Sequence, residues 1–421
     1  MVVLAIHSGV QLGGSTLNAG FAIKSLTQRS HRVHALNRYE DDEGSRYLRR
    51  CGAEMVYFPG FSLKMNTTTI LESTDPSLKR ELITTVQDVV KWVTGFFLTI
   101  THIWRYAPDV VYLTESALLQ CALAARCLRV PVVCEMQAEL IRGRWGLRRS
   151  FYLGLLKSVD IVYGITPFHV QPLLEGSARE RDVRVIPNTI DPTSCAGQAR
   201  DIRAAFTVPA HKKIVAYFGG ASPSKGYTLY LEIVRRMARL RDDVVFLLAG
   251  PFQGDFRSEW AVGSARHDFE HTRYVFEFVK ANALQDAVRI VGEVTDVLTI
   301  IGRADLVVST NTFPHFSRTI IEAFHAGVPI LASRDKFSLD IVEDGVNGLL
   351  ADVDDVDEWV AKAQAVLNSP ANGRRLGLEG RNTYRSRFDE AMVSQQIVAM
   401  FEGLAERASR SASTRGSAHR R

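Results

Sequence analysis

Short runs of apolar, mostly β-branched residues alternate with segments of helical length along the first half of the chain. Uncharged strands separated by helices are typical of a parallel sheet covered on both faces, because such strands are buried on both sides. The first half therefore predicts a doubly wound α/β domain. Its expected strands lie at residues 2–6, 32–36, 54–58, 109–113, 130–135, 160–165 and 183–187.

The alternation starts again after a segment rich in turn formers, residues 187–198. One hydrophobic core grows to about 250–300 residues, and the chain has 421. We therefore expect two Rossmann-like domains, residues 1–190 and 208–388, facing across a cleft lined by the carboxyl ends of their strands. The second set of expected strands lies at residues 213–218, 244–250, 288–292, 304–310, 328–333 and 347–352.

The C-terminal part of the chain follows the last expected strand. A helical pattern covers about residues 389–406 and is expected to pack back near the first domain. Residues 407–421 are rich in Ser and Arg and predict a basic, disordered tail.

Charge is distributed unevenly along a chain whose composition, 46% hydrophobic and 23% charged, is that of a soluble globular protein. Residues 1–207 carry 24 Lys and Arg against 19 Asp and Glu, whereas residues 208–404 carry 22 against 26. A basic first half suits an anionic surface or substrate, although a solvated face explains the excess equally well. Nucleic acid is not an expected partner, because no nucleic-acid-binding motif is present.

Residues 92–104 form the longest uncharged apolar stretch, and at 13 residues they are shorter than the roughly 20 needed to span a bilayer. They predict either an interfacial surface with Trp92, Phe96, Phe97 and Trp104 or a helix packed on a sheet. The N-terminus has no basic leader. The five cysteines show no metal-site spacing and predict reduced, buried thiols. We expect a cytoplasmic protein, with peripheral contact with an anionic membrane at its inner face as an alternative.

Two glycine-containing turns follow predicted first strands. Gly13 and Gly14 precede a helix that begins near residue 15, where glycines let a ligand approach the backbone and free amides bind an anion. A tight turn alone would use the same glycines. In the second domain, Gly219 and Gly220 are followed by Lys225 at the start of a helix, where its charge would neutralise a diphosphate.

A third candidate element is the helix that follows the strand at residues 304–310. From Ser317 onward its first amides are free to bind phosphate oxygens, and Arg318 adds a positive charge. Glu322 lies one turn further in, where its carboxylate would accept hydrogen bonds from a ribose diol. A surface helix with an incidental glutamate is the alternative.

Several motifs together resemble the retaining glycosyltransferases of family four, which have the GT-B fold. They are GGST (13–16), PNTID (187–191), GGASPSKG (219–226), GEVTD (292–296), SRTIIEAFHAGVPILAS (317–333) and EDGVNGLLAD (343–352). The resemblance covers roughly residues 1–400. Residues 44–65 also resemble members that build bacterial surface polysaccharides.

The resemblance implies a nucleotide diphosphate sugar as donor, held mostly by the second domain, and no metal or other cofactor. Lys225 would contact the diphosphate beside Gly219 and Gly220, and Glu322 the ribose. Gly13 and Gly14 would approach the diphosphate from the acceptor-binding first domain. Backbone near Val294 would contact the base. The distal phosphate would be bound at the helix start, by Ser317 and the amides of Arg318, Thr319 and Ile320.

Three positions depart from the family pattern. Gly220 stands where the family has Arg, Pro314 where it has Glu, and Gln137 where it has a His near the reacting sugar. An active enzyme with shifted contacts is one interpretation, in which Arg318 replaces the lost charge, His315 or Asn311 meets sugar hydroxyls, and Gln137 or Glu139 orients the sugar or acceptor. An unusual donor and a non-catalytic binding protein are the others.

Residues 351–359, with two Asp-x-Asp repeats, resemble metal-binding acids of another transferase fold, but their place after a strand and before a helix favours capping. We therefore expect a retaining, metal-independent glycosyltransferase, with Lys225, Glu322 and Gln137 as its catalytic residues. Its expected acceptor is a hydroxyl of a glycan or lipid-linked glycan in surface polysaccharide synthesis. The alternatives are a non-catalytic nucleotide-sugar or glycan-binding protein and an enzyme acting on a small-molecule natural product.

Overall fold

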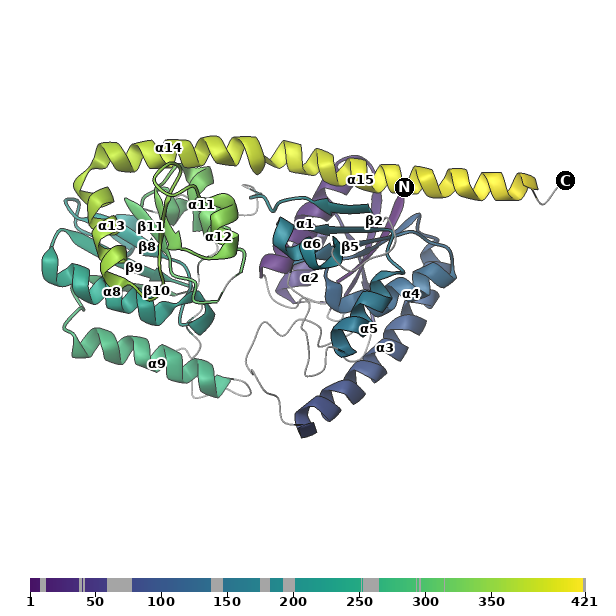
Figure 1. Cartoon of the computed structure of the whole chain (residues 1–421), viewed down its shortest axis with the longest axis horizontal. Coiled ribbons are helices and arrows are strands. Elements are labelled where there is room, and N and C mark those ends of the chain that lie inside the picture. Colours follow the sequence, from purple (N-terminus) through teal and green to yellow (C-terminus); the bar gives the residue numbers. More distant parts are fainter. Residues whose placement is uncertain are drawn as a thin grey trace. The chain divides into compact units, whose positions relative to one another are not determined.

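The structure is a computed structural model, and its described residues form two compact units. It describes residues 1–7, 13–37, 40, 42–58, 78–137, 147–174, 182–191, 201–250, 252, 265–292, 294, 297–313 and 315–418. Unit 1 comprises Met1–Asn188 and Glu390–Arg421, and unit 2 comprises Thr189–Asp389 (Figure 1). Much of the expected linker, residues 192–200, lies outside the described residues.

Unit 1 is built on a parallel sheet whose described strands follow the order β3-β2-β1-β4-β5-β6-β7. The strands are β1 (Val2–Ile6), β2 (Arg32–Asn37), β3 (Glu54–Tyr57), β4 (Val110–Leu113), β5 (Val132–Met136), β6 (Ile161–Gly164) and β7 (Asp182–Val185). The helical elements are α1 (Gly14–Thr27), α2 (Glu43–Arg50), α3 (Leu78–Tyr106), η1 (Ser116–Leu118), α4 (Leu119–Cys127), α5 (Leu147–Leu156), α6 (Pro167–Leu174) and α15 (Glu390–Ala418).

Helices bury both faces of this sheet because successive strand residues point to opposite sides. In β1, Val3 and Ala5 belong to a core with α1 and α15, whereas Leu4 and Ile6 belong to a core with α3, α4 and α5. The uncharged pattern of the strands follows from this double burial.

Unit 2 repeats the plan with the strand order β10-β9-β8-β11-β12-β13. Its strands are β8 (Lys213–Tyr217), β9 (Val244–Ala249), β10 (Val288–Gly292), β11 (Leu306–Ser309), β12 (Ile330–Ser333) and β13 (Leu349–Ala351). Its helical elements are α7 (Ile202–Ala205), η3 (Pro223–Lys225), α8 (Tyr227–Leu240), α9 (Ala265–Ala281), α10 (Val297–Ile301), α11 (Arg318–Ala326), α12 (Lys336–Ile341), α13 (Val356–Asn368) and α14 (Pro370–Arg387).

The predicted fold class, two doubly wound parallel α/β sheets, is confirmed, and each predicted strand is present with ends that differ by a few residues. In each sheet the chain order reverses beside the first strand, between β1 and β4 and between β8 and β11. Loops that leave the carboxyl ends of two such strands diverge, so ligands of open α/β sheets bind there.

The C-terminal helix is longer than expected. α15 continues to Ala418, through residues expected to form a disordered tail. Its inner face packs on unit 1 through Met400 and Phe401. Further along, Arg407 pairs with Asp182 at 3.2 Å, and the contact helps to explain why the basic segment is helical.

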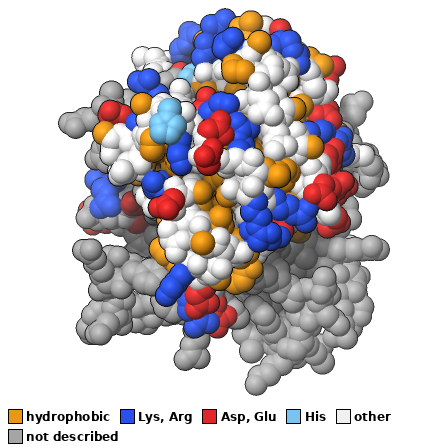
Figure 2. Space-filling model, turned by 90° about the vertical axis from the view of Figure 1, so that its left-hand side faces the viewer, with side chains coloured by type: hydrophobic (Ala, Val, Ile, Leu, Met, Phe, Trp, Pro, Cys, Tyr) orange, Lys and Arg blue, Asp and Glu red, His pale blue; other side chains and the backbone are white. Residues whose placement is uncertain are grey.

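The surfaces of the units carry charged side chains of both signs, and the face of unit 2 in Figure 2 shows Lys and Arg intermixed with Asp and Glu. Some of these residues pair, as Arg241 does with Asp243 at 2.6 Å. Among the described residues, every helix is too short or too polar to cross a lipid bilayer.

Four of the five cysteines lie in the described residues, where they are free thiols. Cys51, Cys121 and Cys134 are buried, and burial raises the pKa of Cys121 to about 12. Cys127 is exposed on the last turn of α4, so the prediction that the thiols are buried is wrong at this position.

Candidate functional site

The turn that carries Lys225 connects β8 to α8 in unit 2. A Cβ added at Gly219 would overlap the Tyr217 hydroxyl, and one added at Gly226 would overlap the carbonyl oxygen of Thr310. Gly226 also has a φ of 70°, in the left-handed region that favours glycine. The two glycines therefore let the turn fold back against the end of its own strand and against the loop after β11.

Side-chain hydrogen bonds hold this turn in place. The hydroxyl of Tyr217 donates to the carbonyl oxygen of Lys225 at 3.1 Å. Thr310, in the loop after β11, donates to the carbonyl oxygens of Lys225 at 3.1 Å and Gly226 at 2.9 Å. The backbone amide of Gly220 donates to the carbonyl oxygen of Ala249 at 2.9 Å. Residues at the ends of β8 and β11 thus fix the backbone of Lys225, and the end of β9 holds the start of the turn at Gly220.

The side chain of Lys225 points to His315. The imidazole Nδ1 donates to the carbonyl oxygen of Phe313 at 2.7 Å, so Nε2 carries the lone pair that accepts from the lysine ammonium. Burial, together with the charge of Lys225, lowers the pKa of His315 to about 4, although the hydrogen bond to the carbonyl of Phe313 acts against the shift. Burial also lowers the pKa of Lys225 to about 8, an effect that the Glu322 carboxylate opposes. At neutral pH the pair is a neutral imidazole and an ammonium group.

Arg318 and Glu322 lie one turn apart on α11, with the guanidinium Nε 3.7 Å from the carboxylate Oε1. Their side chains are 17% and 12% exposed, so both are largely shielded from water. Burial raises the pKa of Glu322, while the charges of Arg318 and Lys225 act in the opposite direction. The carboxylate is therefore near two cations in a partly closed environment.

The start of α11 faces the same region without a side-chain cap. Ser317 is the N-cap residue, but its buried hydroxyl pairs with that of Ser309 at 3.1 Å instead of capping the helix. The amide of Ile320 donates to the carbonyl oxygen of Ser317 at 3.2 Å, so a phosphate would have to share it. Arg318 and Thr319 occupy the first helical turn, where amides point out of the helix end.

The predicted site residues of unit 2 are thus brought together at the β8/β11 reversal, with one exception. Val294 follows β10, and its side chain packs with Phe218 against a core cluster. Its neighbours, residues 293, 295 and 296, lie outside the described residues, as does Pro314. The predicted contact of backbone near Val294 with a base stays a prediction.

In unit 1, Gly13 and Gly14 lie at the start of α1, which follows β1, and Gln137 lies after β5, the neighbour of β4. Gly13 is the N-cap of α1, and an added Cβ there would have no atom within 4 Å. Gly14 is the first residue of the helix. Gln137 follows β5 and donates to the carbonyl oxygen of Thr114 at 3.4 Å. Within the part of the chain that the structure describes, packing does not demand a glycine at position 13.

Two polar groups near these residues were missed by sequence reasoning. His7 directly follows β1 and is buried between the hydroxyls of Thr114 at 2.9 Å and Thr16 at 3.3 Å. Its place directly after the first apolar run was the available signal. The other group is the acid at position 135, inside a predicted strand.

Glu135 is fully buried in β5 and accepts hydrogen bonds from Tyr112 at 2.5 Å and Tyr163 at 2.8 Å. Burial raises the pKa of its carboxyl to about 7, although the hydrogen bonds from both tyrosines and Gln137 act against the shift. A charged residue within an otherwise apolar strand was the signal for this cluster.

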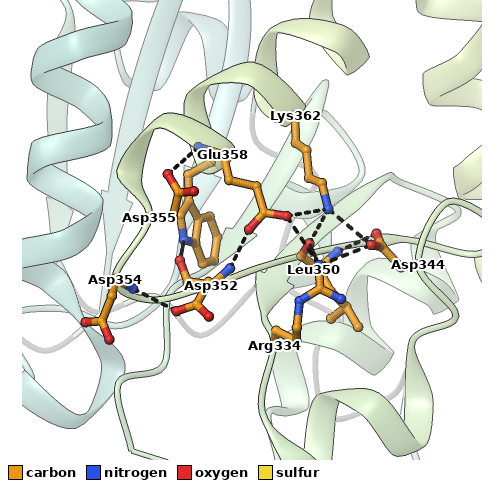
Figure 3. Close-up of polar contacts among 9 residues, drawn as sticks. Arg334, Asp344, Leu350, Asp352, Asp354, Asp355, Glu358 and Lys362 are labelled. Atoms are coloured by element: carbon orange, nitrogen blue, oxygen red, sulfur yellow. Dashed lines mark hydrogen bonds and ion pairs between the residues drawn. The ribbon is translucent and has the colours of Figure 1, made fainter.

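The acids at residues 351–359 have structural contacts (Figure 3). Asp355 caps α13 by accepting from the Glu358 amide at 3.0 Å, and Asp352 accepts from the Asp354 amide at 3.0 Å. The Glu358 carboxylate pairs with Lys362 at 3.0 Å and with Arg334 at 3.3 Å. The capping interpretation is confirmed. Across the described part of the chain, no group of three or more His, Cys, Asp or Glu could hold a metal ion.

Comparison with known proteins agrees with this picture. Residues 198–383 match the family described as Glycosyl transferases group 1. Mannosylfructose-phosphate synthase of Agrobacterium fabrum is 26% identical over 260 residues, covering 59% of this chain and 54% of the synthase. LpsD of Rhizobium meliloti, a lipopolysaccharide core biosynthesis glycosyltransferase, is 24% identical, covering 61% of this chain and 68% of LpsD. The chain spans about half the length of most curated relatives it matches.

Solved structures share the fold over nearly the whole chain. The structure of Anabaena Alr3699/HepE in complex with UDP superimposes with a TM-score of 0.74, covering 96% of this chain and all of that one, at 18% identity. At such low identity the match shows the two-domain GT-B fold alone.

Proposed function

We propose, from the match of residues 198–383 to the family Glycosyl transferases group 1, that the protein transfers a sugar from a nucleotide diphosphate sugar to a hydroxyl group. The observation that carries the proposal is the convergence of Lys225, the start of α11 and Glu322 at the β8/β11 reversal. A cation, the amides of a helix start and a carboxylate in one place fit a diphosphate joined to a ribose.

The donor diphosphate would lie between the Lys225 turn and the first turn of α11. The ammonium group would release His315 and contact phosphate oxygens, with Arg318 and the helix amides nearby. Glu322 would accept hydrogen bonds from ribose hydroxyls. Arg318 thereby replaces the charge that the family has at the position of Gly220.

The reaction breaks the bond between the anomeric carbon and the phosphate oxygen, and the acceptor oxygen bonds the same carbon on the same face, with retention. The acceptor proton passes to the departing phosphate oxygen. The protein's contribution is to position the reactants and to stabilise charge on the leaving nucleotide diphosphate, for which the two cations and the helix end suffice without a metal.

The acceptor would be a glycan or lipid-linked glycan of a surface polysaccharide, and the likeness to LpsD supports this choice. The likeness to mannosylfructose-phosphate synthase supports a small acceptor as the second candidate. In either case Gln137, beside Thr114 and His7, would lie on the side of unit 1 from which the acceptor binds.

A panel of nucleotide sugars, incubated with the full chain and with membrane-derived or soluble acceptors, tests the proposal. We expect turnover of one donor class, an α-linked product from an α-linked donor by NMR, and unchanged rates in EDTA. Binding of nucleotide sugars with no turnover of any donor would instead establish a non-catalytic binding protein.

A further inference from the structure

The outer face of α3 in unit 1 carries a row of exposed apolar side chains. Val86 is 64% exposed, Phe97 63% and Trp104 75%, and Val89, Val90 and Val93 are also exposed. Their spacing of three, four and seven residues places them along one side of the helix. At about 1.5 Å per residue the row, here called the α3 stripe, is about 27 Å long.

The opposite face fixes the orientation of the helix. A Cβ added at Gly95 would lie 2.9 Å from Gln120 of α4, so the two helices approach closely at this point. Ile103 and Thr99 are buried, and Trp92 packs against the core of unit 1. Figure 1 shows α3 along the edge of unit 1, beside α4. The packing that buries one side of α3 therefore holds the stripe outward.

The interpretation of residues 92–104 as a helix packed on its unit is confirmed, whereas the interfacial surface stays a prediction. Trp92 turns inward as part of a helix packed on its unit. Phe97 and Trp104 turn outward, and the valines of the preceding turns extend their surface. A contiguous exposed apolar surface of this size is often functional.

The narrow shape of the α3 stripe favours a membrane over a protein as its partner. A single helix face roughly 10 Å wide and 27 Å long offers about 300 Å², whereas a stable protein interface takes about 800 Å² from each partner. A membrane interface accepts such a narrow row, because an amphipathic helix inserts its apolar side among the lipids. Aromatic side chains such as those of Phe97 and Trp104 favour that region.

Basic residues beside the α3 stripe favour lipids with anionic headgroups. The stripe itself contains no charged residue. Lys91 and Arg105 lie on the same flank of α3, beside the stripe, because helical geometry places residues 14 positions apart on nearly the same side. Residues 1–207 also carry the excess of basic residues. We propose that the α3 stripe docks unit 1 on an anionic membrane surface, with Lys91 and Arg105 facing the lipid headgroups.

Co-sedimentation of the full chain with vesicles tests this proposal, using phosphatidylcholine alone and phosphatidylcholine mixed with phosphatidylglycerol. We expect binding to the anionic vesicles and weaker binding to the neutral ones. The double variant Phe97→Ser/Trp104→Ser should lose at least about tenfold in partitioning, since two exposed side chains leave the lipid. Leu240→Ser/Leu378→Ser, at exposed leucines of unit 2, is the matched control and should bind like the wild type.

Two further measurements test whether Trp104 enters the bilayer and whether the α3 stripe instead joins two copies of the chain. Brominated lipids should quench the fluorescence of the wild type more than that of Trp104→Phe, if Trp104 enters the bilayer. Sedimentation velocity should show the same oligomeric state for the wild type and the Phe97→Ser/Trp104→Ser variant. Absence of vesicle binding, binding that survives the double substitution, equal binding to neutral vesicles, or a dimer that this variant dissociates would each overturn the proposal.

Discussion

Lys225 and Glu322 show how single residues acquire their roles from neighbours distant in the sequence. The lysine ammonium meets a neutral His315, and the carboxylate lies near both Arg318 and Lys225. Burial weakens the charged form of each group, and the opposite charges compensate in part. The site is therefore charged but poorly hydrated, a setting in which an incoming diphosphate forms strong contacts.

Replacing Glu322 with Ala should weaken binding of the donor by about 10- to 100-fold, because charge-assisted hydrogen bonds to the ribose are lost. Isothermal calorimetry with UDP and GDP measures the effect. Glu322→Gln keeps a hydrogen-bond acceptor, so its affinity for the nucleotide should lie between those of the wild type and Glu322→Ala. The control Glu343→Ala, at an exposed glutamate, should bind the nucleotide like the wild type. An affinity for Glu322→Ala equal to that of the wild type would contradict the ribose contact.

Donor binding should also depend on pH through Lys225, whose pKa is lowered to about 8. The ammonium form binds the diphosphate, so affinity should stay nearly constant from about pH 6.5 to 7.5 and fall above pH 8, by about tenfold per unit. Binding measured with the intact nucleotide sugar avoids titration of a terminal phosphate. In Lys225→Arg the cation persists at pH 9, so the fall should disappear.

The same pKa has the opposite consequence for folding. Between about pH 8 and pH 10.5 the unfolded chain holds more protons at this lysine than the folded chain. The contribution of Lys225 to stability therefore rises with pH over that range. A parallel fall of stability and donor affinity above pH 8 would show that unfolding, not the loss of a cation, causes the change in binding.

At the scale of elements, the site depends on two short loops held together at one edge of the unit 2 sheet. Tyr217 ends β8, Thr310 follows β11, and both donate to the carbonyl oxygen of Lys225. Each loop taken alone is an ordinary glycine-containing or polar turn. Their meeting produces the anion-binding geometry.

Helix capping explains the acidic residues before α13. Replacing Asp355 with Ala should lower the free energy of unfolding by about 1 kcal/mol, the usual effect of losing an N-cap side chain. Denaturant titration measures this, and Asp357→Ala is a control within the first turn. Donor turnover by Asp355→Ala should match the wild type with or without added Mg²⁺. Loss of a metal-dependent activity in this variant would contradict the capping role.

The Lys225 turn and the start of α11 could be located from the sequence to within a few residues, because glycine spacing and helix starts are local signals. Lys225, Arg318 and Glu322 were identified in this way. The contact of Lys225 with His315 was not predicted, because it depends on the path of another loop, and His315 had been considered only as a group that would meet sugar hydroxyls. His7 and Glu135 were missed because most of their hydroxyl partners, Thr114, Tyr112 and Tyr163, come from neighbouring strands or the loops after them, distant in the chain.

At the scale of the whole molecule, the chain folds into two units, and its last helix belongs to the first of them. Phe401 of α15 meets Tyr112 of β4 edge to face, with ring centroids 5.4 Å apart. The contact covers the tyrosine that donates to Glu135. α15 therefore completes the core of unit 1 around a buried carboxyl.

Phe401→Ala should destabilise unit 1 by about 3–5 kcal/mol, because a large aromatic side chain leaves a cavity in the core. Thermal unfolding should show an earlier transition, while nucleotide binding by unit 2 persists below it. Arg410→Ala, at a side chain that is 82% exposed near the end of α15, is the control and should leave the transition unchanged. Equal stability of both variants would show that α15 contributes little to unit 1.

The sequence by itself determined the two parallel α/β sheets, the turns with Gly219 and Gly226, and the helix start before Glu322, because apolar period, glycine placement and helix-start signals act over a few residues. Tertiary structure decided that Lys225 meets His315, that Tyr112 and Tyr163 meet Glu135, and which side of α3 faces outward. These contacts depend on strand order and helix packing, which bring together residues up to 90 positions apart.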